Sequence, residues 1–75
     1  MSHFQIGDLV EVRRNNSLSP ALRFFYNNIG IIISLVAESQ KNGRVYMREY
    51  KVIFDNGRHS TFKDYELRLV APINK

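Results

Sequence analysis

The sequence contains no cysteine, and this absence removes several classes of protein from consideration. Without cysteine there is no disulfide scaffold, no cysteine-based zinc finger and no thiol nucleophile. No apolar run approaches the roughly 20 residues that a membrane-spanning helix needs, so we expect no membrane insertion. The first residues also lack the charged and apolar regions of a secretory signal peptide. These absences favour a small soluble domain of the cytoplasm.

The chain is short and mildly basic. It has 75 residues, with 11 Lys and Arg against 7 Asp and Glu, which gives a formal net charge of +4. Hydrophobic residues make up 44%, which is ordinary for a globular protein and too high for a disordered tail. This length allows one domain, which we place over residues 1–75 with its core at about 6–70. A chain of this size buries only roughly 60% of its unfolded surface, so we expect a small core.

Apolar and polar residues alternate with a period of two along much of the chain, which is the pattern of half-buried β-strands. Residues 9–13 and 45–54 show this alternation. Residues 30–36 are instead almost continuously apolar and β-branched, which predicts a strand that is buried on both faces. Shorter strands are expected at 58–62 and 67–69. The sequence therefore predicts five short strands.

Turn residues separate these strands. Asn42-Gly43, within the polar segment 38–44, and Asn56-Gly57 are hairpin signals, because Asn and Gly accept a positive φ at little cost. Residues 63–65 are short and polar enough for a single 3-10 turn before the last strand. The first loop is long, and Ser19-Pro20 predicts the start of one helical turn within it.

We expect these elements to form an all-β, five-stranded and mostly antiparallel small barrel with a long first loop. Closing into a barrel satisfies backbone groups that flat sheet edges would leave unpaired. The residues that the pattern assigns to the core are Val10, Val12, Ile31, Ile33, Leu35, Val52, Phe54, Phe62, Leu67 and Leu69.

Three local patterns resemble the SH3-like small barrel, in the version of the frame that KOW and Tudor domains use. The patterns are GDLVEV at 7–12, GII at 30–32, and VIFDNG at 52–57 leading to FKDYEL at 62–67. Many unrelated functions occur on this frame, so the resemblance implies a fold and leaves the function open.

Two single-domain families of about this length are also similar to the chain. The variable subunit of ferredoxin–thioredoxin reductase resembles it at Gly43-Arg44, at Val52 and Phe54, and at residues 62–67. Photosystem I subunit IV is similar at residues 26–30. In both families the barrel is a non-catalytic accessory that docks onto a larger assembly. The resemblance therefore implies an accessory protein.

Catalytic and metal chemistry find little support among the polar residues. His59 and Ser60 follow Asp55, but neighbours on a strand point to opposite faces, so the pair does not form a nucleophile and its base. His3 and His59 are the only histidines, and two isolated imidazoles make a poor metal site. We expect no enzyme activity, no cofactor, no metal and no small-molecule substrate.

Basic residues lie in or beside the expected loops, together with aromatic residues. Loops of a small barrel can converge at one end, and there they would form one positive surface. Arginine grips carboxylates or phosphates bidentately, and interfaces commonly combine arginines with an aromatic anchor. The residues that we predict to bind a partner are Arg13, Arg14, Arg23, Phe24, Tyr26, Arg44 and Arg58.

These features favour a non-enzymatic binding or accessory module that docks through a basic loop face onto a larger acidic partner, a protein or protein complex. The alternative is a module that binds RNA or single-stranded DNA, in which cations hold phosphates and rings stack on bases. A cage for methylated ammonium groups is disfavoured, because Tyr50, Phe54 and Phe62 fall on the expected core face. Salt separates the first two functions, since phosphate binding weakens steeply as salt rises.

Overall fold

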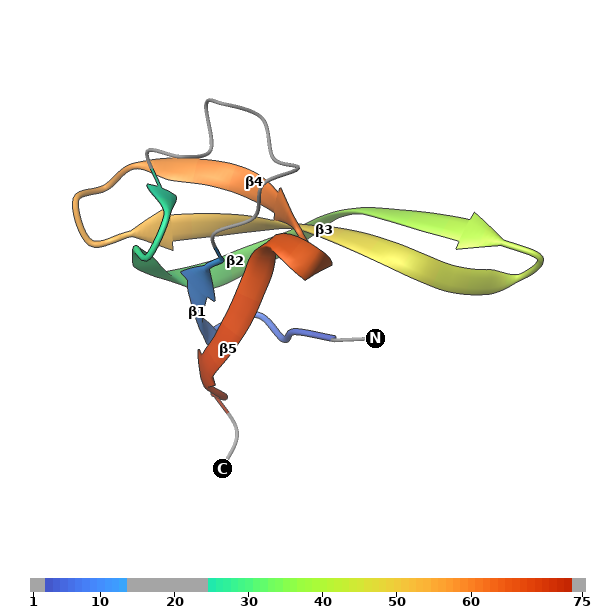
Figure 1. Cartoon of the computed structure of the whole chain (residues 1–75), viewed down its shortest axis with the longest axis horizontal. Helices are drawn as coiled ribbons and strands as arrows, with labels where there is room; N and C mark the ends of the chain where they lie inside the picture. Colours follow the sequence, from blue (N-terminus) through green and yellow to red (C-terminus); the bar gives the residue numbers. More distant parts are fainter. Residues whose placement is uncertain (1–2, 14–24, 74–75) are drawn as a thin grey trace.

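A computed structural model describes residues 3–13 and 25–73 of the chain (Figure 1). One antiparallel sheet holds five strands in the order β4-β3-β2-β1-β5. The strands are β1 (Leu9–Val12), β2 (Ile29–Lys41), β3 (Arg44–Phe54), β4 (His59–Lys63) and β5 (Leu67–Ala71). A 3-10 turn, η2 (Asp64–Glu66), precedes β5. The prediction of an all-β protein with five strands and a 3-10 turn before the last strand is confirmed.

The hairpin between β2 and β3 is longer than the sequence predicted. Segment 38–44 was expected to be a polar loop, but the two strands continue through it until Lys41 pairs with Arg44. Only Asn42 and Gly43 form the turn, with φ of 53° and 78°. A two-residue hairpin turn with positive φ at both positions matches the right-handed twist of its strands. The ribbon therefore stays paired and extends away from the other strands (Figure 1).

The hairpin between β3 and β4 has the expected turn. The Phe54 amide donates to the Arg58 carbonyl at 2.8 Å, and the Gly57 amide donates to the Phe54 carbonyl at 2.9 Å. Gly57 has a φ of 83°, while Asn56 keeps a negative φ. The positive φ predicted at Gly57 is confirmed, and only this residue of the turn needs it.

The core lies on one face of the sheet. Six of the predicted core residues are buried there, and Phe4, Ile32 and Tyr50 complete the cluster. The six are Val10, Val12, Val52, Phe54, Phe62 and Leu67. Phe54 and Phe62 meet edge to face at 6.0 Å between ring centroids, and Phe25 closes the cluster by packing on both rings.

Four of the predicted core residues are exposed, and the prediction that the second strand is buried on both faces is wrong. Ile31, Ile33, Leu35 and Leu69 keep 44%, 39%, 44% and 43% of their surface in contact with solvent. In β2 the inward-facing residues are Gly30 and Ile32, so Ile31 points to the outer face. Ile33 is exposed in step with this alternation, and the register shifts between Ile32 and Ser34 and between Leu35 and Ala37 interrupt the pattern further along the strand. Leu69 lies on β5, which is the last strand of the sheet.

Closure of the barrel stays a prediction. β4 and β5 are the two outer strands, and no ladder joins them within the described residues. The predicted helical turn after Ser19-Pro20 lies mostly outside the described residues. Arg14, Arg23 and Phe24 also lie outside them.

Candidate functional site

Three carboxylates are buried, and each accepts hydrogen bonds from backbone amides. Asp8 accepts from the Gln5 amide at 2.8 Å and from the Ile73 amide at 2.9 Å, so it ties together the two ends of the described chain. Asp64 accepts from the Arg48 amide at 3.3 Å. Glu66 accepts from the Lys63 amide at 2.7 Å, across η2. Because their oxygens hold backbone groups in place, we assign these three residues to the fold rather than to a site.

Two further carboxylates form ion pairs on the surface. Glu38 meets Arg48 at 2.7 Å across the β2–β3 ladder, and Glu11 pairs with Arg68 across the β1–β5 ladder. A hydrogen bond with the Tyr50 hydroxyl and, to a smaller extent, the charge of Glu38 raise the pKa of Arg48. These are the ion pairs found within the described residues.

Most carboxylates are buried or ion-paired, whereas most of the described cations form no ion pair. Only two of the seven carboxylates, Glu49 and Asp55, are neither buried nor ion-paired with a described residue. Six described cations form no ion pair within the described part of the chain, and they are Arg13, Lys41, Arg44, Lys51, Arg58 and Lys63. Among the described residues, cations without an ion pair therefore outnumber carboxylates that are neither buried nor paired by six to two.

Three of the predicted partner-binding residues lie at one end of the sheet. Tyr26 precedes Asn27, whose amide donates to the Val12 carbonyl at 3.0 Å, so the segment around Tyr26 runs beside Arg13. The Arg58 guanidinium lies over the Phe25 ring, 5.5 Å from its centroid. We call Arg13, Phe25, Tyr26 and Arg58 together the aromatic end.

Arg44 is not part of the aromatic end. β3 has 11 residues, with Arg44 first and Phe54 last. At about 3.3 Å per residue its two ends lie about 33 Å apart. The turn before β3 and the turn after it accordingly lie at opposite ends of the longest axis of the molecule (Figure 1). Cationic side chains therefore gather in two separate regions, where the sequence predicted one basic face.

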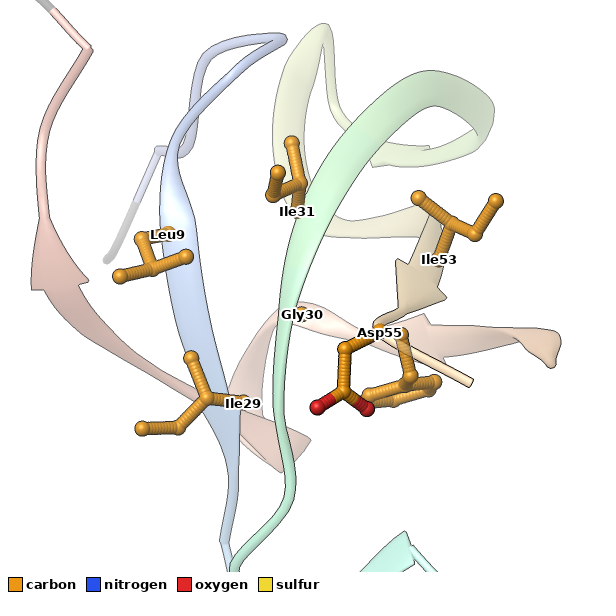
Figure 2. Close-up of a pocket in the computed structure, with 7 residues that line it drawn as sticks. Leu9, Ile29, Gly30, Ile31, Ile53 and Asp55 are labelled. Carbon is orange, nitrogen blue, oxygen red and sulfur yellow. The ribbon is translucent and has the colours of Figure 1, made fainter. Parts of the chain in front are cut away.

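An apolar hollow on the outer face of the sheet was not foreseen from the sequence. Its volume is about 370 Å³, and Leu9, Ile29, Ile31 and Ile53 surround Gly30 at its centre (Figure 2). Asp55 supplies its one charged side chain. The register places Leu9, Ile31 and Ile53 opposite one another across three strands. The signal for this surface was the apolar run from 30 to 36, whose continuous pattern predicted a strand buried on both faces.

His59 and Ser60 do not face each other across β4. His59 lies opposite Ile53 and Ser60 opposite Val52, so the two side chains leave opposite faces of β4. Within residues 3–13 and 25–73, no three His, Cys, Asp or Glu side chains are grouped as metal ligands are. The same residues contain no helix that is long and apolar enough to span a bilayer.

Comparisons with protein-family models, with curated proteins and with solved structures found no match. Three features of the described residues bear on function. These are the aromatic end, the cationic tip of the β2–β3 hairpin and the outer apolar hollow.

Proposed function

We propose that this protein is a non-enzymatic binding module that docks onto a larger acidic protein through its aromatic end. The observation that carries the proposal is that most carboxylates have partners within the described structure, whereas most of its cations form no ion pair. Five of the seven carboxylates are buried or ion-paired, whereas Arg13 and Arg58 have no carboxylate partner among the described residues. An acidic surface would supply those partners, and bidentate contacts between arginine and carboxylate are strong and directional.

The aromatic end has the composition of an interface anchor. Phe25 packs on Phe54 and Phe62, and Arg58 stacks over its outer side. The core thus holds the ring in place, and the ring holds the guanidinium, so less side-chain entropy is lost when a partner binds. Arginine and aromatic residues are also enriched among the residues that contribute most to binding energy.

Exposed apolar surface favours a protein over a nucleic acid as this partner. Ile29, Ile31 and Ile53 stand around the outer hollow, and a protein surface can bury such side chains. The resemblance to accessory subunits that dock onto larger assemblies supports the same function.

Reversing charge at the aromatic end tests the proposal. The partner is captured from the native host in parallel with and without nuclease, identified by mass spectrometry and titrated against purified variants. Arg13→Glu with Arg58→Glu should weaken binding at least about tenfold, because each lost charge-assisted hydrogen bond costs about 1.5–3 kcal/mol. Lys41→Glu with Arg44→Glu is the matched control, since it makes the same change in net charge at the far end of β3.

Circular dichroism must show that both double variants keep the wild-type fold. Equal affinity of the wild type and the Arg13/Arg58 variant would overturn the proposed surface. Loss of the partner on nuclease treatment, with a wild-type affinity that drops about a thousandfold between low and moderate salt, would favour nucleic acid as the partner instead.

A further inference from the structure

The β2–β3 hairpin continues beyond the body of the sheet as a separate two-stranded ribbon. Glu49 is the first residue of β3 that pairs with β4, and Ile31 is the last residue of β2 that pairs with β1. Residues 38–48, which we call the hairpin arm, therefore pair only across their own ladder in the described structure. Figure 1 shows the arm reaching away from the other strands.

The base of the arm is fastened to the body. Asp64 accepts a hydrogen bond from the Arg48 amide at 3.3 Å, and Glu38 and Arg48 form an ion pair across the ladder. An isolated two-stranded hairpin is only marginally stable in water, so these contacts help to hold the arm in one direction. Glu38 is the one carboxylate of the arm, and its ion pair with Arg48 places it at the base rather than at the tip.

The tip of the arm is left with unbalanced positive charge. Lys41 and Arg44 lie directly opposite each other, and both are exposed. Like charges in directly opposed positions of a ladder repel and destabilise it. No Asp or Glu occurs from residue 39 to residue 47, so nothing within the tip offsets the pair. A ligand carrying closely spaced negative charges would relieve this repulsion.

The polar side chains of the tip suit nucleic acid better than protein. Arg and Lys pair with guanine edges, and Asn and Gln pair with adenine edges. The tip offers Gln40, Lys41, Asn42 and Arg44 within one turn and the two residue pairs that precede it in the ladder. Tyr46 is 57% exposed beside them, and tyrosine hydroxyls commonly contact phosphates. The fully buried centre of a protein interface is instead depleted in charged residues.

We propose that the hairpin arm inserts its tip into the major groove of duplex DNA, with Lys41 and Arg44 contacting phosphates or guanine edges. The groove is about 12 Å wide and admits a two-stranded β-ribbon. Ala37 pairs with Glu49 at the base of the arm, and Lys41 lies four residues further along β2. At about 3.3 Å per residue, the distance from Ala37 to Lys41 is about 13 Å, which exceeds the groove depth of about 8.5 Å. The major groove of duplex RNA is too narrow for side chains to read, so the ligand is DNA.

This inference goes beyond the proposed function. It assigns a second ligand to the opposite end of the molecule from the aromatic end. A protein that binds an acidic protein at one end and DNA at the other would act as a connector between the two.

Fluorescence anisotropy with a labelled DNA duplex of about 20 base pairs tests the inference, because binding and its salt dependence are both measured. Lys41→Glu with Arg44→Glu should weaken binding at least tenfold and lower the slope of log K against log salt by about 1.8, the value for two lost phosphate contacts. Arg13→Glu with Arg58→Glu, which changes the net charge equally, should cause a clearly smaller loss and leave the slope near the wild-type value. The variant with Lys41→Ala and Arg44→Ala removes the two positive charges without introducing negative ones. It should also bind DNA more weakly than the wild type, with a lower slope of log K against log salt.

Absence of wild-type binding, or equal losses in the two reversal variants, would overturn the inference. A single strand or an RNA duplex of the same length should bind more weakly than the DNA duplex, and equal or tighter binding would contradict insertion into the major groove. Polyglutamate that displaces DNA at equal charge concentration would indicate an acidic protein at the tip.

The two proposals fail separately. Capture of the acidic protein depends on Arg13 and Arg58, whereas DNA binding depends on Lys41 and Arg44.

Discussion

At the scale of single residues, Gly30 is the position where the sheet leaves no room for a side chain. Gly30 lies in β2 opposite Phe54 and is buried. A Cβ atom added there would lie 2.6 Å from the Ile53 carbonyl oxygen and 2.6 Å from a methyl carbon of Val52. One of these contacts is with backbone, which cannot move aside without disturbing the ladder. Close approach of neighbouring atoms, rather than an unusual φ, therefore requires glycine here.

We predict that Gly30→Ala lowers the free energy of unfolding by about 1–3 kcal/mol, which is the usual cost of overpacking a core. Urea titration followed by circular dichroism measures it. Gly57→Asn is the control, because nothing lies within 4 Å of a Cβ at Gly57 and asparagine tolerates the φ of 83°. If the Gly30 variant is as stable as the wild type, the close packing around Gly30 is incorrect.

At the scale of elements, the hairpin arm and the body of the sheet differ in how they are supported. Residues of β3 from Tyr50 to Ile53 pair with β2 on one side and β4 on the other. Residues of the arm have a ladder on one side only. Local opening is easiest where buried apolar contacts are few and backbone hydrogen bonds face solvent.

Native-state hydrogen exchange should therefore be faster in the arm than in the body. Amides of Lys41 to Met47 are expected to exchange at least about tenfold faster than those of Tyr50 to Phe54. The Arg48 amide should be protected, because Asp64 accepts its hydrogen bond, and Asp64→Ala should remove this protection without changing the tip. Equal rates in the arm and the body would mean that the arm opens only when the whole domain unfolds.

At the scale of the whole molecule, the surplus of unpaired cations affects stability as well as binding. Carboxylates are used for backbone hydrogen bonds and two ion pairs, so most of the remaining surface charge is positive. Net charge of one sign destabilises a compact state by self-repulsion, and salt screens that repulsion. The two exposed ion pairs contribute little to the free energy of unfolding, so their screening by salt costs little stability.

Salt should therefore stabilise the wild-type protein. Raising sodium chloride from about 10 mM to about 0.5 M shortens the screening length severalfold and should raise Tm, by up to roughly 4–8 °C if about 1 kcal/mol of repulsion is removed. Differential scanning calorimetry measures the change. The Lys41→Glu and Arg44→Glu variant brings the formal net charge from +4 to zero, so its Tm should respond much less. A wild-type Tm that falls with salt would show that attraction, not repulsion, dominates its surface.

Local chemistry determined much of the fold. Asn42-Gly43 and Gly57 set the two hairpins, because each turn requires a positive φ that these residues adopt at little cost. Alternation in β3 correctly assigned Val52 and Phe54 to the core. Such features depend only on neighbours in sequence, so they can be predicted from the sequence.

The sequence predicted the position of only some residues of the aromatic end. It placed Arg13, Tyr26 and Arg58 in or beside loops, and these three residues lie at one end of the sheet. Phe25, whose ring lies under the Arg58 guanidinium, was not among the predicted partner-binding residues. The sequence did not indicate that Arg44 lies far from the aromatic end, because the length of the β2–β3 hairpin depends on how far the two strands stay paired. Residues 38–41 have the polar composition of a loop. A strand that faces solvent on both sides has no apolar alternation, so the sequence pattern cannot distinguish it from a loop.

The sequence by itself determined the fold class, the places where the chain turns and most of the core. Only the tertiary structure decided which face of β2 is covered, and therefore that Ile31 and Ile53 line an outer hollow while Ile32 is buried. It also decided which carboxylates hold backbone amides and which cations stay unpaired. The physical reason is that strand register, bulges and cross-strand partners arise from contacts between distant residues, and a continuous apolar run fits either face of a sheet equally well.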